Sequence, residues 1–92
     1  MDRFTEVRQN PEMPSRDIDG QLYVLDSQRG VLHSFNPVGS FIWSLLREKR
    51  TIEDVVRAIA GEYDVNAQTA ERDVLSFLTE LRSKDLILVG GD

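Results

Sequence analysis

The dipeptide Asn36-Pro37 divides the sequence into two halves with different hydrophobic periodicity. Before it, apolar residues come in short clusters separated by turn residues, a pattern typical of a small antiparallel sheet. After it, apolar residues recur every three or four positions, as on one face of an amphipathic helix. Asn is a preferred helix N-cap and Pro fits the first helical position, so the change coincides with a helix start. The sequence therefore predicts an α+β fold in which strands precede helices.

The first half predicts a three-stranded antiparallel sheet. Asp19-Gly20 separates two short extended runs, and Asp-Gly is a frequent hairpin turn. A second turn, Ser27-Gln28-Arg29-Gly30, leads into a third extended run. The three strands are expected at 15–18, 21–26 and 31–35.

The two ends of the sequence give weaker patterns. Pro11 and Pro14 interrupt any regular element before the first predicted strand, so residues 1–14 are expected to be irregular. At the other end, the apolar run 86–89 either forms a final strand or packs on the sheet. The whole chain, residues 1–92, is expected to form a single domain, because so short a chain builds only one core.

Three helices are predicted after the strands, each with a capping residue. Asn36, Thr51 and Asn66 are the expected N-caps, and Asp54 completes a capping box with Thr51. Trp43 lies off the apolar stripe of its helix and is expected at the edge of the core. The stripes of the first and third helices are Val38, Phe41, Ile42, Leu45 and Leu46, and Ala70, Val74, Phe77, Leu78 and Leu81.

The residues needed for catalysis are scarce in this chain. It has no cysteine and one histidine, His33, so the usual ligands of zinc and iron–sulfur clusters and any thiol nucleophile are missing. No serine stands in a G-x-S-x-G motif, and there is no Gly-rich phosphate loop. We therefore expect a protein that is not an enzyme, with no catalytic residue, no metal site and no cofactor.

The formal net charge of -5 disfavours a nucleic-acid partner, because such binding depends on neutralising phosphates. In the predicted third helix, residues 67–84, acidic and basic residues are equal in number. DNA binding remains an alternative, since winged domains share this order of helices, and a structural subunit of a larger enzyme is another. With no signal peptide and no apolar run that crosses a membrane, we expect a cytoplasmic protein without a membrane partner.

One predicted helix flank carries candidate binding residues. Leu75 lies off the main stripe of the third helix, Leu78 and Arg82 are assigned to the same shoulder, and Asp73 lies at the border of burial. Beside a strand that carries Leu32, these residues would form a groove. A strand at the edge of the sheet, with unpaired backbone groups, would also accept a peptide as a further strand.

Four segments together resemble the PqqD family, named for the pyrroloquinoline-quinone biosynthesis protein D and also known as the RiPP recognition element or peptide-modification chaperone. The segments are 33–43 (HSFNPVGSFIW), 51–56 (TIEDVV), 62–65 (EYDV) and 73–81 (DVLSFLTEL). The resemblance spans about residues 15–87. It departs from the family at Asp85-Leu86-Ile87, where the family often has Gly before its last apolar pair.

This resemblance implies a winged helix-turn-helix-like domain, with three strands and three helices, that has no catalytic activity. Its members bind the leader segment of a ribosomally made precursor peptide and present it to a modifying enzyme, often a radical-SAM protein or a leader peptidase. The leader adds to the third strand and lies against the third helix. The open strand edge is compatible with a monomer or a weak dimer. The implied peptide-binding residues are Val31, Leu32, His33, Ser34, Phe35, Asp73, Leu75, Leu78 and Arg82.

Overall fold

The computed structural model describes residues 1–90, which form six strands and three helices. The first two predicted strands have the expected bounds, and the third ends one residue early, at Ser34. The strands are β1 (Glu6–Gln9), β2 (Ser15–Ile18), β3 (Gln21–Asp26), β4 (Val31–Ser34), β5 (Arg50–Thr51) and β6 (Ile87–Val89). The helices are α1 (Pro37–Leu45), α2 (Ile52–Tyr63) and α3 (Ala67–Ser83).

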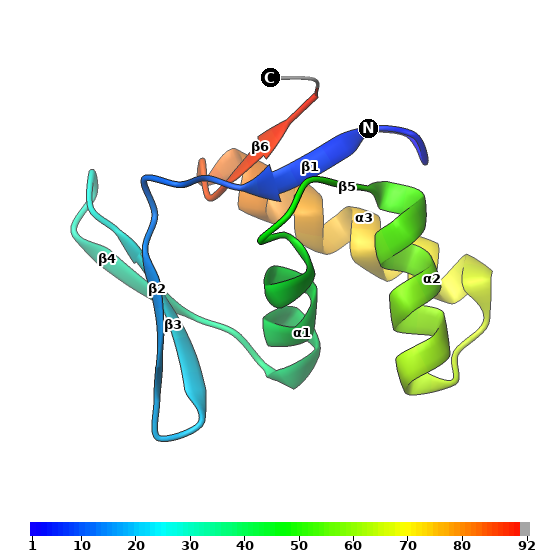
Figure 1. Ribbon diagram of the computed structural model, residues 1–92, viewed down its shortest axis with the longest axis horizontal. Coiled ribbons are helices and arrows are strands. Elements are labelled where there is room, and N and C mark those ends of the chain that lie inside the picture. The colour runs from blue at the N-terminus through cyan, green and yellow to red at the C-terminus, as the bar shows by residue number, and fades with distance from the viewer. Residues whose placement is uncertain (91–92) are drawn as a thin grey trace.

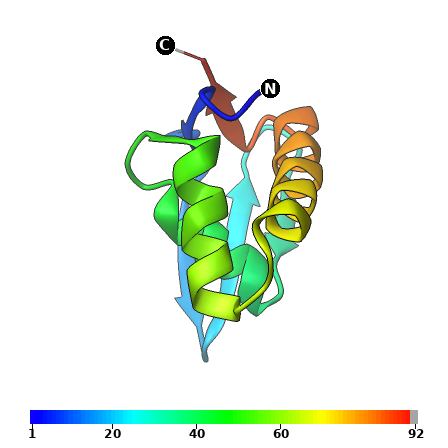
Figure 2. The ribbon, with the colours of Figure 1, turned by 90° about the vertical axis from the view of Figure 1, so that its right-hand side faces the viewer.

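The strands form two antiparallel sheets, in the orders β2-β3-β4 and β5-β1-β6. The predicted α+β fold, with a three-stranded sheet and three helices, is confirmed, and the second sheet is additional. In Figure 1, α1 stands between the sheet of β2 to β4 on one side and α2 and α3 on the other. Figure 2 shows α2 and α3 side by side, with the long strands behind them.

All three predicted helix caps are present. The Asn36 side chain accepts a hydrogen bond from the Gly39 amide at 2.7 Å, and Asn66 does the same for its own helix. Thr51 and Asp54 form the predicted capping box, in which each side chain accepts from the other's backbone amide at 3.1 Å. These bonds satisfy amides that a helix N-terminus leaves unpaired. They also lower the pKa of Asp54, chiefly through the Thr51 amide.

The expectation that residues 1–14 are irregular is wrong for β1. This strand pairs with β5 on one side and with β6 on the other, so it is the centre of its sheet. Val7 is its single buried apolar residue, and one such residue gives no periodicity to detect. Its strand conformation depends on partners from distant parts of the chain. The apolar run near the C-terminus supplies one of them, as the final strand β6.

Helix α1 is buried on two sides, which corrects the expectation for Trp43. Ile42 is 3 % exposed and Trp43, the neighbouring residue, is 2 % exposed. The Gln9 side chain also donates to the Trp43 carbonyl at 2.7 Å, so β1 is held against α1. Because α1 lies between two layers, residues off its main stripe are buried as well (Figure 1). Trp43 is therefore a central core residue.

A buried carboxylate connects the β3–β4 turn to the end of α3. Asp26 is fully buried and accepts hydrogen bonds from the amides of Gln28 and Arg29 and from Arg29 Nη1, the last at 2.8 Å. The Arg29 guanidinium also donates to the Lys84 carbonyl and pairs with Asp85 at 3.0 Å. The Arg29 side chain is the main cause that holds the pKa of Asp26 below its ordinary value. This network fixes β4 beside the C-terminal end of α3.

We expect the contribution of this carboxylate to stability to be lost in acid. A folded-state pKa below the unfolded value of about 3.9 means that the stabilisation is present at neutral pH and disappears as the pH falls below about 4. Asp26→Asn should therefore lower the urea midpoint at pH 7, and the difference from the wild type should shrink near pH 3. Urea titrations at both pH values measure this. If the urea midpoints of the two proteins differed equally at both pH values, the ionised Asp26 carboxylate would not be the source of this stability.

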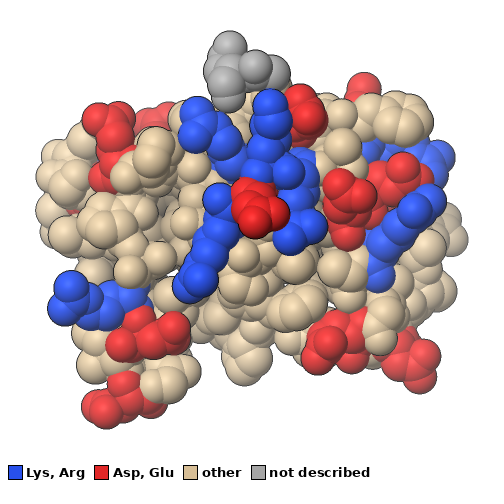
Figure 3. All heavy atoms as spheres, viewed as in Figure 1, with Lys and Arg blue, Asp and Glu red and all other residues tan. Residues whose placement is uncertain are grey.

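Basic residues gather on one face of this acidic chain. Figure 3 shows Lys and Arg side chains near the centre of the face over β1 and the turn before β5, with acidic residues around and among them. Elsewhere on this face the charges are mixed and mostly acidic toward the lower corners.

Residues 1–90 contain neither a membrane-spanning helix nor a cluster of metal-ligating side chains. None of the helices there is both long and apolar enough to cross a membrane. Within the same residues, His, Asp and Glu side chains form no group of three or more placed to hold a metal ion.

Candidate functional site

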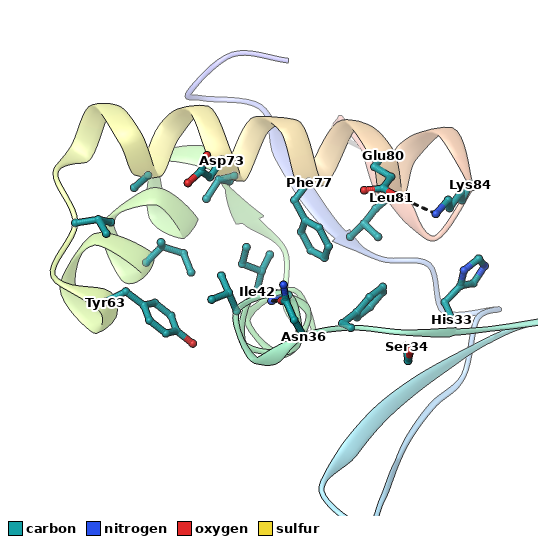
Figure 4. Close-up of a pocket in the computed structure, with 17 residues that line it drawn as sticks. His33, Ser34, Asn36, Ile42, Tyr63, Asp73, Phe77, Glu80, Leu81 and Lys84 are labelled. Atoms are coloured by element: carbon teal, nitrogen blue, oxygen red, sulfur yellow. Dashed lines mark hydrogen bonds and ion pairs between the residues drawn. The ribbon is translucent and has the colours of Figure 1, made fainter.

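A groove of about 580 Å³ lies between β4 and α3. In Figure 4 α3 runs along one side, β4 along the other, and α1 is seen end-on at the base between them. The C-terminal end of α2 contributes Tyr63, and Val65 follows from the loop before α3. The groove therefore draws on four elements, and its position depends on α1 holding the sheet and α3 apart.

The floor of the groove is apolar and aromatic. Phe35 lies 5.8 Å from Trp43 and 5.5 Å from Phe77 between ring centroids, the second pair edge-to-face. A Cβ atom on Gly39 would lie 3.1 Å from both Phe35 and Phe77, so a residue without a side chain lets α1 approach this pair closely. Ile42 extends the floor toward α2. Such a surface favours apolar side chains of a ligand.

The rim formed by α3 is charged. Asp73, Glu80 and Lys84 lie along the same flank of the helix (Figure 4). Lys84 Nζ lies 3.1 Å from Glu80 Oε1, so these two charges are paired. Among residues 1–90 the one ion pair of the Asp73 carboxylate is with Arg72, at 3.7 Å, and its side chain is 69 % exposed. The rim therefore presents an exposed carboxylate that a basic group of a ligand can reach.

The opposite wall is an edge strand. β4 pairs with β3 on one side, and no other strand pairs with it among the described residues. His33 faces α3 and Ser34 points away from it (Figure 4), as the alternation of side chains along a strand requires. The Nε2 atom of His33 is buried and has no hydrogen-bond partner within residues 1–90. An edge strand with unpaired backbone groups beside an apolar groove is suited to accept an extended peptide.

The structure brings together four of the nine residues predicted for the site. His33, Ser34, Phe35 and Asp73 line the groove. Residues that do not line it are Val31, Leu32, Leu75, Leu78 and Arg82.

The assignment of Leu75, Leu78 and Arg82 to the groove wall is wrong. Leu78 is fully buried in the core, and Leu75 is packed against that core. At 100° per residue, Leu75 and Arg82 lie on the flank of α3 opposite to Asp73. The periodicity identifies the buried stripe and both of its flanks, but only tertiary packing decides which flank faces β4.

Sequence reasoning missed the residues of the other flank. Phe77 was predicted to belong to the core stripe, whereas it is half-buried and forms part of the groove floor. Glu80 and Lys84 follow it at helical spacing, and Asp73 precedes it by one turn. The repeat 73–77–80–84 was visible in the sequence as a second flank of the stripe, and Asp73 was its one predicted member.

Comparisons with known proteins agree with this architecture. A family model described as "Coenzyme PQQ synthesis protein D (PqqD)" matches residues 21–87. A search of curated protein sequences finds no match.

Three solved structures resemble the chain. TbiB1 in complex with the TbiA(beta) leader peptide is 38 % identical, with a TM-score of 0.82, over 92 % of this chain and 99 % of that one. Lasso peptide synthetase B1, complexed with the leader peptide, is 27 % identical, with a TM-score of 0.79, over 89 % and 96 %.

The third is the PqqD truncation of Methylobacterium extorquens PqqCD, described as a RiPP recognition element. It is 15 % identical, with a TM-score of 0.73 over 90 % of this chain and 88 % of that one, a likeness of fold alone. The family match covers more than half of the chain. The chain belongs to the PqqD family.

Proposed function

We propose that this protein is an adaptor that binds the leader segment of a ribosomally made precursor peptide in the groove between β4 and α3. The observation that carries the proposal is the apolar groove beside an unpaired strand edge. Two solved structures that resemble the chain were determined with leader peptides bound, and one of them is 38 % identical to it.

Strand addition accounts for binding with few demands on the ligand sequence. A peptide that pairs with the free edge of β4 gains backbone hydrogen bonds whatever its side chains are. The other edge strand of this sheet, β2, contributes no residue to the groove. The leader is therefore expected at β4, where backbone pairing and an apolar surface are available together.

The groove also predicts which leaders are selected. Alternate side chains of an added strand point to one face, and those that face α3 would meet the floor of Phe35, Ile42 and Phe77. An apolar leader residue is expected there. Asp73 is expected to favour a Lys or Arg nearby, with an effect on association rate more than on affinity.

The bound leader would be presented to an enzyme that acts on the precursor, such as a radical-SAM protein or a leader peptidase. In this proposal the adaptor itself performs no catalysis. We place the step in the cytoplasm, because ribosomal precursors are made there.

The test is a titration of leader peptide into isotope-labelled protein. The probe is the N-terminal half of each short open reading frame found beside the gene, taken as a candidate precursor. Amide shifts are expected in residues 31–36 and on the groove flank of α3, residues 73–84. Shifts concentrated on β2, or no shifts with any encoded precursor, would contradict the proposal.

A pair of variants on α3 separates the two flanks. Phe77→Ala removes an aromatic ring from the groove floor and should weaken leader binding about tenfold, since apolar anchors carry most of the affinity of such contacts. Leu75→Ala is the matched control, because Leu75 is also a half-buried apolar residue but lies on the opposite flank. Isothermal titration calorimetry measures both. A larger loss in the control would place the peptide on the flank first predicted from the sequence.

A further inference from the structure

Four cations lie close together in the fold, away from the groove: Arg8 on β1, Arg47 and Lys49 between α1 and β5, and Arg50 on β5. We call these four residues the basic cluster. Figure 3 shows Lys and Arg side chains gathered near the centre of the face over β1 and the turn before β5. Two carboxylates, Glu6 and Glu48, lie among them, at 3.9 Å from Lys49 and 4.0 Å from Arg50. Without these four cations, the remaining residues carry a net charge more negative than the -5 of the whole chain.

Backbone pairing holds these charges together. Val7 pairs with Arg50 across β1 and β5, so the next residue of β1, Arg8, follows this pair and the preceding residue of the turn, Lys49, lies before it. Arg8 makes no ion pair among residues 1–90. The fold thus maintains a local concentration of positive charge that its own carboxylates neutralise only in part.

The basic cluster and the groove lie on opposite sides of the molecule. In Figure 2, α3, which forms the groove wall, is on one side, and the turn between α1 and β5 is on the other. No residue of the basic cluster lines the groove. A molecule that covers the cluster therefore leaves the groove accessible.

We infer that the basic cluster docks an acidic surface of the enzyme that receives the leader-bound precursor, an inference that rests on the proposed function. An adaptor must hold its peptide and its enzyme at the same time, and only a surface remote from the groove permits this. The partner is a protein, because Glu6 and Glu48 within the cluster suit a surface of mixed charge. A uniform polyanion would meet these two carboxylates and the acidic remainder of the chain.

The experiment uses biolayer interferometry to measure binding of candidate precursor-modifying enzymes, namely any radical-SAM protein or leader peptidase found encoded near the gene. The double variant Arg8→Glu/Lys49→Glu should bind the enzyme at least tenfold more weakly than the wild type. Wild-type binding should also weaken between about 50 and about 300 mM NaCl, because exposed charges are screened. Arg57→Glu, which changes an exposed cation on α2, is the control and should bind as the wild type does.

A parallel titration with the leader peptide distinguishes this inference from the proposed function. Unchanged leader affinity in the double variant, together with lost enzyme binding, supports docking at the basic cluster. Enzyme binding that is absent in the wild type, or equal in the double variant, overturns it while leader binding still stands. Leader affinity that falls in the double variant also overturns it, and so does duplex DNA or anionic-vesicle binding that the double variant abolishes. Failure of the wild type to bind any leader refutes the proposed function itself.

Discussion

Trp43→Ala is expected to lower the free energy of unfolding by about 3–5 kcal/mol, which is most of the stability of a domain of this size. The side chain is 2 % exposed and lies in α1 between the two layers of the fold. Its removal leaves a cavity that both layers border, so neither can close it without moving away from the other. Urea unfolding followed by far-ultraviolet circular dichroism measures the change, because the variant has no tryptophan left for fluorescence.

Two truncations serve as controls for Trp43. Leu32 is 57 % exposed, and Leu32→Ala should change stability by less than about 0.5 kcal/mol. Phe41 was predicted as a core residue of the stripe, but it is half-buried and meets Tyr63 edge-to-face, so Phe41→Ala should cost less than Trp43→Ala. If Phe41→Ala were the more damaging change, the position of α1 between the layers would be wrong.

Proline substitutions in β4 are expected to abolish leader binding at one position and the strand itself at the next. Along an antiparallel strand, the backbone groups of successive residues point alternately to the partner strand and to the free edge. Of Leu32→Pro and His33→Pro, one therefore removes an amide that faces the incoming peptide. This variant should fold and should bind leader at least tenfold more weakly. The other should disrupt pairing with β3.

Circular dichroism and calorimetry on both proline variants check this expectation. His33→Ala controls for loss of the imidazole. The equivalent pair on the remote edge strand β2, Arg16→Pro and Asp17→Pro, controls for damage to a sheet edge. Leader affinity that survives in every variant that folds would show that the peptide does not pair with β4. If the folded β2 variants lost leader affinity instead, the peptide would pair with β2 and not with β4.

Local interactions explain why so much of the fold was predictable. Asn36, Thr51 and Asn66 each bond to amides three residues ahead, so the information for a helix start lies within four residues. The hairpin at Asp19-Gly20 is equally local, because both residues adopt positive φ angles. The edge strand of the candidate site was predictable because it follows directly from this meander.

The errors have a common cause, since they concern elements defined by distant partners. β1 has one buried apolar residue and is a strand because β5 and β6 lie beside it. Trp43 lies off the stripe of α1 and is buried because α1 is covered twice. Leu75 and Phe77 occupy opposite flanks of one stripe, and only the position of β4 makes one of them a groove residue. The hydrophobic periodicity of a single sequence does not determine which distant elements pack together.

The pairing of β1 with β6 has a consequence for how the chain folds. Val7 stands opposite Val89, so this contact closes a loop that contains nearly the whole described chain. Loop-closure entropy makes such a contact costly until the intervening elements are compact, and contacts of this kind slow folding. The sheet β5-β1-β6 should therefore form after the hairpins and helices. β1 and β6 then become ordered in the same late step, and their amides should share one free energy of opening in native-state hydrogen exchange.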